Sequence, residues 1–167
     1  AWIDRIQPEK IVTTQLNNWG RYVHGWFNSW TSSEDVVEIT EGMSLVVSDC
    51  RRSTSCPISR HKSTNLLKSI LLKEEANNKS AHETIILNTD GYVAECVVSN
   101  IFVVSDGSVV TPSLDTNILP GITRTTVLDI CKNKGIPVSE ERFTIERLVK
   151  SDEVFITNSL MEIMPVS

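Results

Sequence analysis

The chain has 167 residues, of which 40% are hydrophobic and 22% charged, and its formal net charge is −5 at pH 7. This length and composition predict about one soluble globular domain and exclude a disordered tail, a collagen-like repeat and a fibrous coil. The mild negative charge gives no electrostatic reason to expect nucleic acid or an anionic membrane as a partner. No apolar run reaches the roughly 18 residues that cross a bilayer, and residues 1–5 do not form a signal peptide.

The four cysteines, Cys50, Cys56, Cys96 and Cys131, include no C-x-x-C pair. A zinc site or thioredoxin-type chemistry is therefore not predicted, and we expect no bound metal. A chain of this length with an ordinary core does not need disulfides, so we expect four reduced thiols in a cytoplasmic protein. The sequence does not begin with Met and ends directly after an apolar segment, so we expect a fragment of a longer protein.

Residues 1–42 differ from the rest of the chain because aromatic residues cluster there. The apolar positions fall at helical spacing and predict an amphipathic helix with an aromatic face: Trp19, Tyr22, Val23, Trp26 and Phe27. The stretch is not basic, so packing against a core is a better interpretation than a platform for stacked bases. We expect residues 1–42 to be a linker or helical segment and residues 43–167 to form the main domain.

Residues 43–78 predict a strand, a loop and a helix. The strand covers residues 43–50 and the polar loop residues 51–57. The helix is predicted from about residue 63 to residue 78, where apolar residues recur at helical spacing. The residues that share its apolar face are Leu66, Leu67, Ile70, Leu71 and Ala76.

Residues 83–111 are rich in strands. Residues 83–88 and 92–95 flank an Asp-Gly turn, and residues 100–104 and 108–111 flank another. Asp-Gly between two apolar runs is a strong hairpin signal. Two such hairpins in succession predict an antiparallel meander.

The last part of the chain mixes helices and strands. A helix is predicted for residues 122–134, with Gly135 as its stop, and a short helix for residues 144–150. Strand-like stretches begin at Pro137 and cover residues 154–157. Because helices and strands do not strictly alternate, we predict the α+β class.

Three local features point to chemistry. Residues 120–124 (PGITR) open a helix, and its backbone N–H groups with the Thr123 hydroxyl suit a phosphate, although such a turn is also ordinary helix punctuation. Lys62 precedes a helix and can form a Schiff base, although most lysines are simply solvated. Glu95 lies between apolar residues, so it is either partnered or exposed at a sheet edge. A lysine, a carboxylate and a helix N-terminus are together the parts that pyridoxal 5′-phosphate needs.

Six ordered motifs resemble the fold-type IV pyridoxal-phosphate enzymes. They are residues 61–67 (HKSTNLL), 91–95 (GYVAE), 99–103 (SNIFV), 111–115 (TPSLD), 118–124 (ILPGITR) and 157–166 (TNSLMEIMPV). That family contains branched-chain aminotransferases, D-amino-acid aminotransferases and 4-amino-4-deoxychorismate lyases. The resemblance implies the large C-terminal cofactor-binding domain of the D-amino-acid-aminotransferase-like fold, truncated at its C-terminus, with most of the small N-terminal domain absent.

Carried over by position, the resemblance implies roles for six residues. Lys62 is implied to be the Schiff-base lysine, which also moves protons, and Glu95 the partner of the pyridine nitrogen. The other implied contacts are Ile122 and Thr123 in the phosphate-binding turn, Ser159 as a second phosphate contact, and Asn158 where lyase members place an active-site Asn.

The resemblance implies an enzyme and leaves its reaction open. Residues 111–115 and 157–161 look most like aminodeoxychorismate lyase, which forms 4-aminobenzoate and pyruvate from 4-amino-4-deoxychorismate in folate biosynthesis. Residues 19–22 and 49–52 are similar to branched-chain aminotransferase-like members. The alternative is therefore a branched-chain or D-amino-acid aminotransferase that moves an amino group to a 2-oxo acid. A cofactor-free binding domain of the same fold is the remaining alternative.

The family also implies a small-molecule substrate and a homodimer. Its small domain normally supplies a phosphate-binding arginine. Arg51 and Arg52 do not match the position of that arginine, so we expect both to be solvated loop residues.

Overall fold

The computed structural model describes residues 42–167, so the aromatic helix predicted around residues 19–27 lies outside the described residues. Two sheets form the centre of this part of the chain. The strands of the first sheet, in the order β1-β2-β3, are β1 (Leu45–Arg52), β2 (Glu83–Asn88) and β3 (Val93–Cys96). Those of the second, in the order β6-β5-β4-β7-β8, are β4 (Asn100–Ser105), β5 (Ser108–Pro112), β6 (Val138–Glu141), β7 (Glu153–Asn158) and β8 (Glu162–Pro165).

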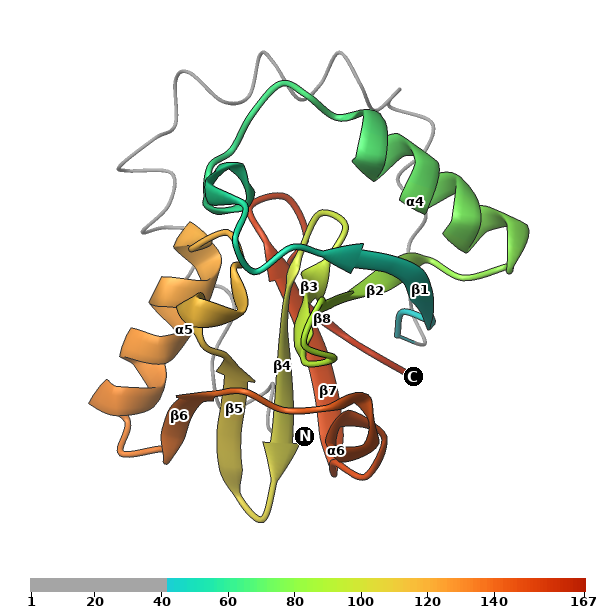
Figure 1. Ribbon diagram of the computed structural model, residues 1–167. Helices are drawn as coiled ribbons and strands as arrows, with labels where there is room; N and C mark the ends of the chain where they lie inside the picture. Colours follow the sequence, from blue (N-terminus) through green and yellow to red (C-terminus); the bar gives the residue numbers. More distant parts are fainter. Residues whose placement is uncertain (1–41) are drawn as a thin grey trace.

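Helices lie beside both sheets (Figure 1). Helix α4 (Leu67–Asn78) packs on β1 and β2, and helix α5 (Ile122–Asn133) packs on β6 and β7. The remaining helical segments are the 3-10 helices η1 (Pro57–Arg60) and η2 (Leu114–Thr116) and the short helix α6 (Ile145–Val149). The strands pair both ways, since β1 is parallel to β2 and β5 to β6 while the other pairs are antiparallel. The prediction of an α+β fold is confirmed.

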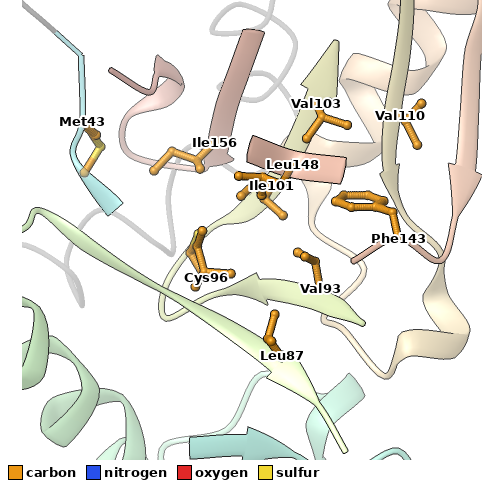
Figure 2. Close-up of a cluster of buried hydrophobic side chains, with 11 residues drawn as sticks. Met43, Leu87, Val93, Cys96, Ile101, Val103, Val110, Phe143, Leu148 and Ile156 are labelled. Carbon is orange, nitrogen blue, oxygen red and sulfur yellow. The ribbon is translucent and has the colours of Figure 1, made fainter. Parts of the chain in front are cut away.

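Strand β4 shows how the core is divided, because its side chains alternate between two apolar clusters. Phe102 and Val104 face the cluster under α5, where the Phe102 ring stacks on Phe155 at 4.8 Å between centroids. Ile101 and Val103 face the opposite way, into a cluster that joins both sheets to α6 (Figure 2). All four β4 side chains are fully buried. The second sheet therefore lies between two apolar layers, and polar groups at its strand ends are held rigidly.

The predicted antiparallel meander is wrong, although both Asp-Gly hairpins form. The first hairpin pairs β2 with β3, and the second pairs β4 with β5 in the other sheet. Between them the chain turns sharply, with the Cys96 N–H bonded to the Ser99 carbonyl at 2.8 Å. Strand β4 then pairs with β7 instead of β3, although β7 begins only at Glu153. Local turn signals predicted the hairpins but carry no information about such distant pairing.

Helix α4 also differs from its prediction, because it begins at Leu67 and its predicted apolar face is largely exposed. Leu67, Ile70 and Leu71 are 64%, 46% and 56% exposed, whereas Leu72 and Ala76 are buried against the sheet. The helix packs on the sheet through a different face from the one that the spacing of its apolar residues indicated. Strand β8 was not predicted, since its sequence, Glu-Ile-Met-Pro, is short and ends in proline.

Among the described helices, none is long and apolar enough to cross a membrane. The four cysteines, all within residues 42–167, are free thiols. No group of three or more metal-ligating side chains occurs within that range.

Candidate active site

Glu95, near the end of β3, is a buried and fully partnered carboxylate. It is 6% exposed, and its Oε1 lies 2.8 Å from Nη2 of Arg52. Its Oε2 accepts a hydrogen bond from the Leu119 N–H at 2.9 Å and a longer one from the Asn100 amide at 3.3 Å. Burial raises the pKa of the Glu95 carboxyl to about 7, although the Arg52 charge and the Leu119 N–H both act to lower it. Of the two interpretations left open by the sequence, the partnered carboxylate is the one observed.

Arg52 corrects the expectation of a solvated loop residue. It is the last residue of β1, its side chain is only 14% exposed, and it forms the ion pair with Glu95. Its Nη1 also donates to the carbonyls of Ser59 and Asn117, at 3.1 and 3.4 Å. Arg51 does lie at the surface, as expected. Successive side chains of a strand point to opposite faces, so only one of two adjacent arginines can turn toward Glu95.

The N-terminus of α5 lies next to this carboxylate. Gly121 is its N-cap residue, and no side chain caps the helix, so the helix dipole favours an anion at this end. Thr123 is buried and Ile122 half exposed. A Cβ at position 121 would lie 2.1 Å from Oδ1 of Asn100, so glycine is required for the close approach. Because Asn100 also contacts Glu95, the predicted phosphate turn and the predicted pyridine partner belong to one cluster.

Lys62 lies on the exposed loop between η1 and α4. Its positive charge acts to lower the pKa of the Glu95 carboxyl, which puts the two groups within electrostatic range of each other. Figure 1 shows this loop running from the end of β1, past the start of α5, and over to α4. The loop is tied to the same region by Arg60, whose Nε donates to Oδ1 of Asn117, two residues before the Leu119 N–H that binds Glu95.

Asn158 is the last residue of β7 and Ser159 follows it in a turn. Both lie beside the start of β4, because Asn100 and Thr157 are cross-strand neighbours. The Asn158 amide donates to Oγ of Ser99 at 3.1 Å, and its Oδ1 accepts two backbone N–H groups from the following turn. This amide therefore shapes the turn, and its contact with a substrate stays a prediction. Ser159 is exposed at the turn, and its phosphate contact likewise stays a prediction.

The donors and acceptors in this cluster fit pyridoxal 5′-phosphate. Oε1 of Glu95 takes one hydrogen bond, from Arg52, and retains acceptor capacity for a protonated ring nitrogen. Oγ1 of Thr157 is buried and makes no hydrogen bond to the part of the chain that the structure describes, so it is available to a bound group. The uncapped α5 N-terminus supplies an anion site. The Glu95 carboxylate and the α5 N-terminus are thus neighbours through the Asn100 amide, and the roles of Lys62 and of the phosphate contacts stay predictions.

Two surface hollows lie outside this cluster. One, of about 530 Å³, follows α4 and is lined by residues such as Lys68, Leu71 and Glu75. The other, of about 390 Å³, is lined by η1 and its neighbours and includes His61, next to Lys62, and Asn117. Neither is lined by a predicted site residue, so neither defines the site by its shape.

Comparison with known proteins agrees with this geometry. The model of the amino-transferase class IV family matches residues 28–167. A D-alanine aminotransferase of Listeria innocua is 40% identical over 130 residues, which are 78% of this chain and 44% of that protein. An aminodeoxychorismate lyase of Bacillus subtilis is 39% identical over 115 residues, 69% of this chain and 39% of that protein. Among solved structures, a branched-chain amino acid aminotransferase of T.th. in complex with pyridoxamine 5′-phosphate superposes with a TM-score of 0.71 and 36% identity, covering 75% of this chain and 42% of that one.

The fold and the cluster define a pyridoxal-phosphate enzyme of fold type IV. This chain belongs to the class IV aminotransferase family. Membership confirms the family resemblance, the expectation of an enzyme and the cofactor, pyridoxal 5′-phosphate. The chain spans about 44% of the length of the D-alanine aminotransferase that it matches.

Sequence reasoning missed three parts of the site. Arg52 does not match the position of the family's phosphate-binding arginine, so the sequence indicates a solvated loop residue there. Asn100 was taken only as the start of a strand, and Gly121 as helix punctuation. The sequence of β1 holds no signal that separates Arg52 from Arg51, because its pairing with β2 shifts register between Val47 and Arg51. The contacts of Asn100 and Gly121 depend on the packing of α5 against β4, which local sequence does not encode.

Proposed function

We propose that this chain is the cofactor-binding part of an aminodeoxychorismate lyase, which converts 4-amino-4-deoxychorismate to 4-aminobenzoate and pyruvate. The observation that carries the proposal is the buried, Arg52-paired Glu95 carboxylate beside an uncapped helix N-terminus. The lyase assignment is supported by the 39% identity to the Bacillus subtilis lyase and by the Thr157-Asn158-Ser159 turn.

In this proposal each residue of the chain has a defined task. Lys62 would hold the cofactor through its aldehyde and would serve as the base that takes a proton from the substrate. Bound pyridoxal phosphate supplies an electron sink for the charge that this proton transfer leaves behind. Glu95 would hold a proton on the ring nitrogen, and the Arg52 charge acts against the rise in the pKa of Glu95 that burial causes. The α5 N-terminus, Thr123 and Ser159 hold the phosphate.

The lyase reaction needs few contributions from the protein beyond these residue roles. Loss of pyruvate leaves an aromatic ring, so the product side is strongly favoured, and the protein mainly positions groups and transfers protons. A base on an exposed loop and a buried, partnered carboxylate are suited to that task. We also propose that the enzyme is a cytoplasmic homodimer of the folate pathway, to be checked by sedimentation of the full-length protein.

Transamination is the second candidate, and a specific observation favours it. The D-alanine aminotransferase of Listeria innocua is as similar to this chain as the lyase is, at 40% identity. The Asn158 amide, which the lyase assignment gives to the substrate, is engaged in its own turn. In this candidate the same Lys62 moves a proton between the substrate carbon and the cofactor, and the amino group is passed to a 2-oxo acid.

One experiment separates the two candidates. The full-length protein, loaded with pyridoxal phosphate, is given 4-amino-4-deoxychorismate, and pyruvate and 4-aminobenzoate are measured; in parallel it is given D-alanine or L-glutamate with a 2-oxo acid. The proposal expects equal amounts of both lyase products, and no product from the K62A variant. Amino transfer without pyruvate release from 4-amino-4-deoxychorismate would replace the lyase by the aminotransferase. Absence of any visible cofactor absorption in the parent protein would overturn both.

A further inference from the structure

Asn117 stands out because it is a buried residue in a left-handed backbone conformation. It follows η2, with φ 68° and ψ 44°, and it is 1% exposed. Residues other than glycine rarely adopt this conformation, and asparagine is among the few that tolerate it. A turn at this position could be built with less strain from glycine, so the amide side chain needs a reason of its own.

That side chain forms three hydrogen bonds, all of them with one distant loop. Its Nδ2 donates to the carbonyls of Ser53 and Cys56, both at 2.7 Å. Its Oδ1 accepts a hydrogen bond from Nε of Arg60 at 3.0 Å. All three partners lie within residues 53–60, more than 55 residues earlier in the chain, and this loop leads directly to Lys62.

The segment of residues 117–119 also contacts the Glu95 carboxylate and its partner Arg52. The Asn117 carbonyl accepts from Nη1 of Arg52, whose Nη2 is paired with Glu95. Two residues further on, the Leu119 N–H donates to Glu95 at 2.9 Å. Residues 117–119 therefore touch the lysine loop through one side chain and the Glu95 carboxylate through the backbone.

Apolar packing does little to hold the loop. None of the four residues of η1 is buried, and residues 60–66 are exposed, so burial does not fix this segment. In a segment held by polar contacts, three hydrogen bonds from one buried amide set the position of the backbone.

From this geometry we propose that Asn117 is a positioning residue, which fixes the lysine-bearing loop relative to Glu95 and so sets the distance from Lys62 to the reacting carbon. The inference rests on the proposed role of Lys62. A displacement of about 1 Å in such a base costs about 100-fold in rate, so the amide contributes to turnover without touching the substrate.

The test uses three variants of the full-length protein. N117G keeps the left-handed backbone and removes the amide. N117D keeps the acceptor for Arg60 but places an oxygen opposite the two carbonyls that the amide nitrogen contacts. N117A removes both the amide and the preference for the left-handed backbone. D106G is the matched control, because Asp106 is also left-handed, at φ 50°, but is exposed in the β4–β5 turn. Amide hydrogen exchange over residues 53–62 is measured in the cofactor-free protein, and kcat in the loaded one.

The proposal expects N117G to exchange faster across residues 53–62 and to lose about 100-fold in kcat, with little change in KM. N117D should be at least as impaired as N117G, although asparagine and aspartate tolerate this backbone equally. D106G should match the parent. An N117G variant with unchanged exchange and kcat overturns the proposal, since the left-handed turn alone would then explain the residue.

If N117G does not fold, the R60A variant tests the positioning role of Asn117 instead. It removes one of the three contacts and should raise exchange over the same residues by a smaller factor; unchanged exchange overturns the proposal. Failure of the proposed function gives a different result, namely a parent protein that takes up no cofactor, whereas the exchange measurement does not involve the reaction.

Discussion

Glu95 and Lys62, the two groups on which the proposed chemistry depends, are held in opposite ways. Glu95 lies in a packed interior, where an ion pair, a backbone N–H and an amide fix it between the sheets and α5. Lys62 lies on an exposed loop whose 3-10 helix buries no residue. Burial and an ion pair thus hold the Glu95 half of the proposed site, whereas hydrogen bonds to Asn117 hold the loop of the Lys62 half. Substitutions in the first half should act on stability, and those in the second on turnover.

Replacing Lys62 should give the largest effect, and it should change turnover with little change in stability. K62A removes the proposed base, so turnover of 4-amino-4-deoxychorismate should fall by about 10⁴-fold or more. Because the residue is exposed, the unfolding temperature should stay within about two degrees of the parent. K68A is the control, since Lys68 is also exposed and its ammonium donates to the Arg51 carbonyl. Near-normal turnover of K62A would remove Lys62 from the site.

Replacing Arg52 should show the reverse, a large loss of stability. R52A leaves a buried carboxylate without its cation, which costs about 3 kcal/mol of unfolding free energy when the carboxyl is ionised. Loss of the positive charge also moves the pKa of Glu95 further upward from about 7. Urea unfolding at pH 8 measures the effect. The neighbouring R51A should change the free energy of unfolding by less than about 0.5 kcal/mol, and equal effects of the two variants would contradict the assignment of Arg52.

Gly121 tests the contact between the phosphate turn and Asn100. In G121A the new Cβ collides with the Asn100 amide, so we expect about 2 kcal/mol of destabilisation and weaker binding of pyridoxal phosphate. Equilibrium unfolding and a cofactor titration measure the two effects. T125A, on the exposed side of the same helix, is the control. Unchanged cofactor affinity in G121A would mean that the phosphate lies elsewhere.

The pH dependence of stability gives the smallest effect per measured step, a change per pH unit. The pKa of Glu95 is raised from its ordinary value of 4.5 to about 7. In the cofactor-free protein the folded state therefore binds more protons than the unfolded state between these values. Its contribution to stability is complete below the unfolded pKa and is lost as pH rises through the folded pKa, with a slope of at most about 1.4 kcal/mol per pH unit. E95Q should flatten this part of the stability curve, and an unaltered curve would mean that another group titrates there.

The sequence predicted most of the local structure. Both hairpins, helix α5, strand β7 and the α+β class follow from turn residues and apolar spacing, which are encoded within a few neighbouring residues. The resemblance of ordered motifs predicted the family and its cofactor, since a combination of short motifs in fixed order is far more specific than any one of them.

What the sequence did not predict depends on distant partners. The division of the hairpins between two sheets, the exposed apolar side of α4 and the burial of Arg52 are each decided by packing between segments far apart in the chain. A solvated arginine and a buried, paired one look the same in sequence, because only the position of the carboxylate distinguishes them. The assignments of Asn158 and Ser159 stay predictions, since their turn is observed but its ligand contacts are not.

The long separation between the lysine loop and Asn117 has a consequence during protein synthesis. Asn117 is made 55 residues after Lys62. At a translation rate of about 5–20 residues per second, Asn117 is added to the chain roughly 3 to 11 seconds after Lys62. During that interval the nascent chain contains Lys62 but not Asn117, the residue proposed to position its loop. The reactive site therefore assembles only on a chain that has been translated through η2 and the start of α5, and prematurely terminated chains that stop before Asn117 cannot complete it.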